Sequence, residues 1–195
     1  MVFPIRFSPT DGKVVVRAGR RLVSIIASAL FVGLAVGGGS AAGQTGDAQY
    51  AQVGLEAHNQ YRALHGTPPM TLRQEMIDAA RQCAQYYAEK QTIDHTCPHK
   101  SDAGENLYLA RGGSSDAVQH VGTAVQMWYD EVSLYDYGNP VFSRETGHFT
   151  QVVWKASTQL GIGFATQGDI RVVVALYTLH GNVRTQFETN VPRPL

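Results

Sequence analysis

The 195-residue chain is long enough for one globular domain, and its composition, with 44% hydrophobic and 16% charged residues, excludes a disordered or fibrous protein. Residues 43–195 carry 11 Lys and Arg against 15 Asp and Glu, a net charge of −4. A mildly acidic domain has little attraction for a phosphate backbone, which excludes nucleic acid as a partner.

The first 42 residues have the order of a secretory signal peptide. A basic stretch ends at Arg21, an uncharged apolar run covers residues 22–36, and small residues follow at 37–43. The apolar run is shorter than the roughly 20 residues of a membrane-spanning helix, although the adjoining glycines could extend it into an uncleaved anchor. We therefore expect a signal peptide over residues 1–42, an extracellular product, and no membrane span after cleavage.

The two cysteines, Cys83 and Cys97, allow one intramolecular pairing, which an oxidising compartment would permit. A loop of about 15 residues closed in this way is worth about 3 kcal/mol in the chain-entropy model. Two unpaired thiols, with Cys83 filling a core position, agree with the sequence nearly as well. No Asn-X-Ser/Thr sequon is present.

Three stretches of the mature chain have helical periodicity. Apolar residues recur at steps of three and four over residues 48–64, and this pattern stops at a glycine and a proline pair. Thr71 and Gln74 fit a capping box for a second helix that runs to about residue 90. A third helix is predicted over residues 116–135.

Glu131 lies on the apolar stripe of this third helix, three residues after Trp128. An ionised carboxylate on a buried face costs several kcal/mol unless it is paired. The sequence therefore predicts a partner for Glu131.

The remaining elements are strands and loops. Residues 91–104 and 135–145 have no periodicity and are predicted to be loops, as is the tail from Gly181. Strands are predicted at 106–110, 149–154, 160–166 and 170–177, and the last two form an antiparallel hairpin. Gly161 and Gly163 share one strand face, which indicates close approach by a helix or by another backbone segment.

His148 stands at the beginning of the predicted strand in residues 147–154. Alternation places it on one face with Thr150, Val152 and Trp154. A titratable group in this position would be held rigidly by the core and could still face a cleft.

Helices before and between strands, with a hairpin near the end, predict an α+β fold with an antiparallel sheet covered by helices. Five motifs stand in the chain in this order: His58-Asn59-x-Tyr61-Arg62-x-x-His65-Gly66, Gly104-Glu105-Asn106-Leu107, Trp128-Tyr129-x-Glu131, Gly147-His148-Phe149-Thr150-Gln151-Val152-Val153-Trp154 and Tyr177-x-x-x-Gly181-Asn182-Val183. Through these motifs the chain resembles the CAP superfamily. That superfamily comprises the cysteine-rich secretory proteins, antigen 5 and the pathogenesis-related 1 proteins.

This resemblance implies a CAP (SCP) domain over residues 43–195, folded as an α-β-α sandwich with a large surface cleft. The spacing looks most like the Golgi-associated plant pathogenesis-related branch, and the fungal secreted members are a second resemblance. His58, Asn59, Tyr61 and Arg62 are expected to pack and bond within the fold, and His180 to lie in a surface loop.

In the family two histidines and two glutamates line the cleft, and the matching positions are His95, Glu105, Glu131 and His148. Imidazoles and carboxylates are competent ligands for zinc and similar divalent cations. The resemblance favours His95 and His148 as ligands with Glu105 and Glu131 nearby. A structural network without metal is the alternative, and no cofactor is required.

Two details of this site stay open. His99 lies in the same loop as His95, which is preferred because Thr96 matches the family's His-Ser/Thr pair. The sequence has no nucleophile motif, so metal-dependent hydrolysis through Glu105 or Glu131 is a lesser alternative to binding.

The aromatic loop with Tyr135, Tyr137 and Phe142 resembles the family region implicated in sterol capture. Exposed aromatic side chains could accept a lipid or sterol, or they could plug the core. The sequence thus predicts a secreted CAP protein that acts by binding, with lipid or sterol as the expected ligand. An extracellular recognition module that acts on a protein receptor is a further alternative.

Overall fold

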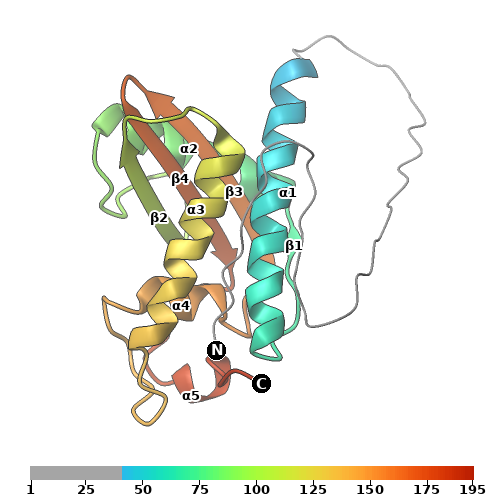
Figure 1. Cartoon of the computed structure of the whole chain (residues 1–195), viewed down its shortest axis with the longest axis vertical. Helices are drawn as coiled ribbons and strands as arrows, with labels where there is room; N and C mark the ends of the chain where they lie inside the picture. The colour runs from blue at the N-terminus through green and yellow to red at the C-terminus, as the bar shows by residue number, and fades with distance from the viewer. Residues whose placement is uncertain (1–40) are drawn as a thin grey trace, which may run out of the picture. The chain divides into compact units, whose positions relative to one another are not determined.

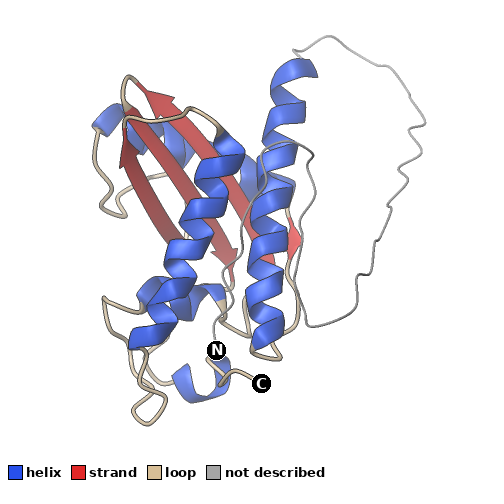
Figure 2. Ribbon diagram, viewed as in Figure 1, coloured by secondary structure: helices blue, strands red, loops and turns tan. Residues whose placement is uncertain are grey.

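The computed structural model describes residues 41–195, which form a four-stranded sheet with helices on both faces (Figures 1 and 2). The strand order is β1-β3-β4-β2, with bounds Thr71–Leu72, Gln159–Gln167, Ile170–Thr178 and Gly104–Arg111 respectively. β1 pairs parallel to β3, and the other pairings are antiparallel. The predicted leader lies outside the described residues except for its last two positions.

The helices are α1 (Ala41–Leu64), α2 (Gln74–Lys90), α3 (Ala117–Asp130), α4 (Gly147–Val152), α5 (Phe187–Asn190) and the 3-10 turn η1 (Glu131–Leu134). α2 covers one face of the sheet, while α1 and α3 lie together on the other (Figure 1). This arrangement is the α-β-α sandwich that the sequence predicts. Within residues 41–195, no helix is both long and apolar enough to cross a bilayer.

The β3–β4 hairpin and its contact with α2 agree with the prediction. A Cβ atom on Gly161 would clash with the backbone of Met76, and one on Gly163 would clash with the backbone of Ala80. α2 can therefore lie directly on the sheet, and its side chains Met76, Ala80, Cys83, Ala84 and Tyr87 join those of β2 and β4 in one core.

The strand predicted at 149–154 is wrong, because residues 147–152 form helix α4. Every side chain from Phe149 to Trp154 is buried, including the polar ones of Thr150 and Gln151, so no exposed face of this segment reveals its period. Periodicity cannot separate a short buried helix from a buried strand in such a run, and Phe149, Val152 and Val153 also fit helical spacing. His148 therefore lies in the first turn of a helix instead of at a strand end.

Two helix boundaries and the tail also differ from the prediction. The backbone N–H of Thr71, a residue of β1, bonds the carbonyl of Thr158, so Thr71 does not cap α2. The N-cap residue is Arg73, whose side chain makes no capping bond. α3 ends at Asp130, and Glu131 starts η1 instead of continuing the buried stripe. The C-terminal tail includes one short helix, α5.

Candidate functional site

His148 and Glu131 form a close pair where α4 meets η1. The Nδ1 atom of His148 lies 2.6 Å from Oε1 of Glu131, and Oε2 accepts the backbone N–H groups of His148 and Phe149 at 3.0 and 3.1 Å. Glu131 thus satisfies two amides at the beginning of α4, which helix geometry leaves without partners in their own helix. The sequence predicted a partner for Glu131, and the first turn of α4 supplies it.

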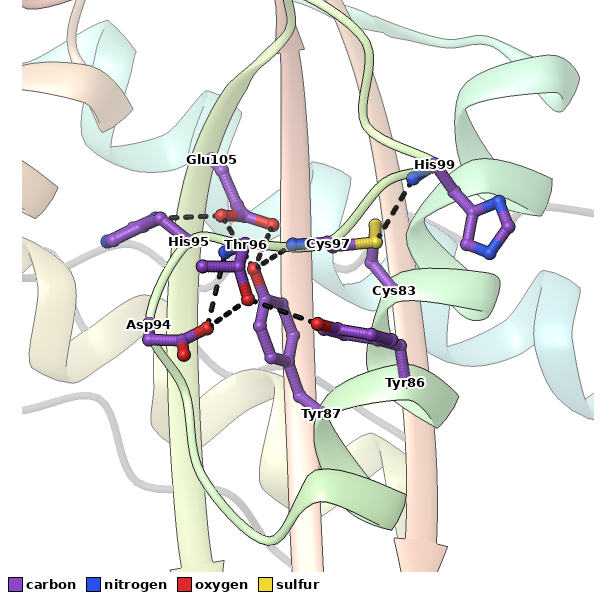
Figure 3. Close-up of a disulfide and its surroundings, with 9 residues drawn as sticks. All are labelled: Cys83, Tyr86, Tyr87, Asp94, His95, Thr96, Cys97, His99 and Glu105. Atoms are coloured by element: carbon purple, nitrogen blue, oxygen red, sulfur yellow. Dashed lines mark hydrogen bonds and ion pairs between the residues drawn. A yellow bond between two sulfur atoms is a disulfide. The ribbon is translucent and has the colours of Figure 1, made fainter.

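His95 and Glu105 form a second pair, shown in Figure 3. The Nδ1 atom of His95 lies 2.7 Å from Oε2 of Glu105, a residue of edge strand β2. The Glu105 side chain is only 2% exposed, whereas that of His95 is 55% exposed. The hydroxyl of Tyr87, a residue of α2, donates to the same carboxylate. His99 is exposed, and its backbone N–H bonds Cys97 Sγ, so His95 is the histidine that reaches Glu105.

Both pairs have the same chemical consequence for the imidazole. A carboxylate can only accept, so Nδ1 carries the proton and the neutral ring keeps its lone pair on Nε2. Among residues 41–195, neither Nε2 atom has a hydrogen-bond partner. His95 and His148 can therefore each bind a cation, or accept a hydrogen bond from a ligand, through Nε2.

The four predicted residues come together as two separate pairs that meet at strand β2. Glu105 points toward α2, while the next residue, Asn106, points to the opposite face and donates to the carbonyl of His148 at 3.1 Å. Across residues 41–195, no three His, Cys, Asp or Glu side chains gather closely enough to hold one metal ion.

A buried chain of hydrogen bonds continues from Asn106 to His58, which the sequence analysis expected to bond within the fold. The Asn106 amide also donates to the Tyr177 hydroxyl, which lies 2.8 Å from Nε2 of His58 in α1. The Nδ1 atom of His58 lies 2.7 Å from the Gly54 carbonyl, so Nδ1 is the donor and Nε2 the acceptor. Burial lowers the pKa of His58 to about 4. The only sequence signal was that His58, Asn106 and Tyr177 stand within family motifs.

The buried residue Arg62 holds α4 in place. Its guanidinium donates to the carbonyls of Pro68, Val152, Trp154 and Ser157 at 2.8–3.1 Å. Burial lowers the pKa of Arg62 to about 10. Three of these carbonyls belong to the last residue of α4 and to the residues after it, so Arg62 fixes the end of α4 opposite to Glu131.

The aromatic loop divides into a buried part and an exposed part. Tyr135 is 8% exposed, and its ring packs on Phe149 and on Tyr137, with ring centroids 5.5 and 4.8 Å apart. The guanidinium of Arg193 covers Tyr137 at 5.1 Å. Phe142 is 50% exposed, so of the three aromatic residues proposed for lipid it is the one that offers a large surface.

The two cysteines are joined. A disulfide links Cys83 in α2 to Cys97, which lies two residues after His95 (Figure 3). Cys83 is fully buried and Cys97 is 4% exposed. Of the two alternatives left by the sequence, the structure has the disulfide.

The chain is similar to known proteins in sequence and in fold. Residues 55–177 match the family model described as CAP, cysteine-rich secretory protein family. The human Golgi-associated plant pathogenesis-related protein 1 is 35% identical over 158 residues, which cover 78% of this chain and 98% of the relative. The Candida albicans protein named secreted protein RBT4 is 35% identical over 144 residues, 70% of this chain and 37% of the relative.

Solved structures share the fold. The crystal structure of NaASP2 with Zn²⁺ aligns with a TM-score of 0.60 at 22% identity, covering 75% of this chain and 87% of that protein. The sandwich, the ordered motifs and these matches together define a CAP domain. The chain belongs to the CAP family, and its similarity extends over nearly the whole human Golgi-associated relative.

Proposed function

We propose that this CAP domain is a secreted, non-catalytic binding protein for a small amphipathic molecule of the sterol or fatty-acid class. The observation that carries the proposal is the position of an exposed apolar loop beside His148. Val141 and Phe142 are each 50% exposed, and a Cβ atom on Gly147 would lie 3.2 Å from the Phe142 ring. Gly147 directly precedes His148.

This arrangement suits a ligand with an apolar body and one polar end. The body would cover Phe142 and Val141, whose exposed surface gains free energy when water is removed from it. A hydroxyl group could donate to the Nε2 lone pair of His148, and a carboxylate could bind the protonated ring. Secretion is part of the proposal and is supported by the leader that the sequence predicts over residues 1–42, by the disulfide, and by relatives that are named as secreted proteins.

A lipid-binding assay tests this function. Radiolabelled cholesterol and a radiolabelled fatty acid are titrated against the purified protein and the variants Phe142→Ser and His148→Ala. Loss of the Phe142 contact should weaken binding about tenfold, because covering part of a phenyl ring contributes about 1–2 kcal/mol. Leu64→Ser is the matched control, since Leu64 is 53% exposed at the end of α1. Equal affinity of Phe142→Ser and Leu64→Ser would remove the loop from the proposal.

A second candidate, binding of zinc or another divalent cation, is supported by the two His–Glu pairs. Metal-bound histidines almost always donate their other N–H to a carboxylate or carbonyl, and His95 and His148 have carboxylates in this position. The residues therefore fit the role of ligands through Nε2, with water as the remaining ligand. Glu131 already accepts three hydrogen bonds and would orient His148 instead of binding the cation.

Calorimetric titration with zinc chloride tests the metal candidate. His95→Ala and His148→Ala should each reduce the heat of binding. His99→Ala is the matched control, because His99 lies in the same loop as His95 and is also exposed. It should leave the heat of binding unchanged, since His95 and not His99 pairs with Glu105. Identical titrations of the wild type and of both ligand variants would refute metal binding at the pairs.

Two alternatives have their own signatures. Metal-dependent hydrolysis would appear as turnover of an ester or peptide library that Glu131→Gln abolishes. A recognition module for a protein receptor would bind its partner equally well in Phe142→Ser and His148→Ala.

A further inference from the structure

The disulfide and the His95–Glu105 pair are joined through one side chain, that of Tyr87. The Tyr87 hydroxyl accepts the backbone N–H of Cys97 at 3.0 Å and donates to both oxygens of Glu105 at 3.2 and 3.3 Å (Figure 3). An ionised carboxylate only accepts and a backbone amide only donates, so the direction of both bonds is determined.

The other side-chain bonds of the loop that carries His95 lie at its exposed surface, where Asp94 and Thr96 bond each other, Lys90 and Tyr86. His95 has φ 63°, a left-handed conformation that costs a non-glycine residue about 1 kcal/mol or more. Gln91 and Ser101 in the same segment also have positive φ values. The ion pair of Lys90 with Asp94 is solvent-exposed and contributes little. The Cys83–Cys97 bond is the covalent tie of this loop to α2.

We propose that Tyr87 is a positioning residue that transmits the disulfide constraint to Glu105, so that His95 presents Nε2 outward only in the oxidised chain. The disulfide holds Cys97 against α2, the Cys97 amide fixes the Tyr87 hydroxyl, and that hydroxyl fixes the carboxylate that takes the Nδ1 proton of His95. Oxidative folding in the secretory pathway therefore completes the His95 half of the site. His148 is oriented by Glu131 and needs no disulfide.

The Cys83–Cys97 bond can be opened by thiol–disulfide exchange, which would free the His95 loop from α2. A dithiol such as dithiothreitol supplies two electrons and two protons, the Cys83–Cys97 bond breaks to two thiols, and the reductant closes to its own disulfide. Because both cysteines are buried, the native protein is expected to resist this exchange, and substitution is the cleaner perturbation. The role of His95 in binding a ligand rests on the proposed function, whereas its tautomer does not.

Long-range ¹H–¹⁵N NMR of the full mature protein at about pH 8, above the pKa of a free imidazole, reads the tautomers directly. In the wild type, His95 and His148 should both be protonated on Nδ1. In Tyr87→Phe, which keeps the disulfide, His95 should shift to the Nε2–H form that imidazole favours in water, while His148 stays unchanged. The double variant Cys83→Ser/Cys97→Ser should behave in the same way.

Tyr86→Phe is the matched control, because the neighbouring hydroxyl of Tyr86 contacts Thr96 and not Glu105. It should leave both histidines in the Nδ1–H form. Retention of the Nδ1–H form by His95 in Tyr87→Phe, or an equal change at His95 and His148, would overturn the positioning role. The spectra need no lipid or metal, so failure of either binding candidate leaves this test intact.

Discussion

Acidification should destabilise the fold through His58, which lies at the end of the buried chain of hydrogen bonds. The imidazole is fully buried, accepts from Tyr177 and donates to the Gly54 carbonyl, so a second ring proton would point at a hydroxyl that already donates to Nε2. Burial lowers the pKa of His58 from 6.5 to about 4. Between pH 6.5 and about pH 4, His58 is therefore mostly protonated in the unfolded chain and mostly neutral in the folded chain.

The sign and the size follow from this difference. Stability rises with pH wherever the unfolded state binds more protons, so the penalty is absent near neutral pH and grows as the pH falls below 6.5 toward 4. At about pH 4 it amounts to about 3 kcal/mol from His58 alone. Burial also lowers the pKa of His65, which adds to the loss with the same sign.

Urea unfolding of the wild type and of His58→Gln at about pH 7 and about pH 4 checks this prediction. Glutamine can accept from Tyr177 but does not titrate. The loss of unfolding free energy between the two pH values should be about 3 kcal/mol smaller in the variant. An equal loss in both proteins would refute the assignment of the acid sensitivity to His58.

Two further stability predictions come from the helices around the sheet. Arg62→Met should lower the unfolding free energy by about 3 kcal/mol or more in urea titrations, because it leaves buried carbonyls without donors. Arg73→Met, at an exposed position, is the control and should change the unfolding free energy by less than about 0.5 kcal/mol. Gly163→Ala should lower the melting temperature, since its methyl group would clash with the backbone of Ala80, while Gly46→Ala in α1 meets nothing within 4 Å and should be neutral or stabilising. Similar melting temperatures for these two glycine variants would contradict the close contact of α2 with the sheet.

Elements with a polar face or a marked end were predictable from sequence. The apolar stripes of α1 and α2 stop at glycine, proline or polar residues. The turn at Gly168 joins an alternating run at 160–166 to a run at 170–177 that is rich in β-branched residues. Gly161 and Gly163 predicted the close approach of α2, because two glycines on one face of a strand interior weaken the strand unless another backbone packs against them.

The site was predictable in its residues but less so in its arrangement. Glu131 was expected to need a partner because it followed the apolar stripe of α3. Its carboxylate binds backbone amides of α4. No local sequence pattern encodes such a contact between residues 17 positions apart. Every side chain from Phe149 to Trp154 is buried, so the sequence carried no sign of which period applied. The division into two pairs depends on the alternation of Glu105 and Asn106 at a sheet edge, which only the register of β2 settles.

Native mass spectrometry of the protein purified from its own secretory pathway shows most directly whether it carries a ligand of the sterol or fatty-acid class. We expect the wild-type mass to exceed that of the polypeptide by the mass of one amphipathic molecule, and this extra mass to be lost in Phe142→Ser and His148→Ala but not in Leu64→Ser. A bare polypeptide mass in the wild type, or an adduct that all three variants retain, would contradict the proposed function.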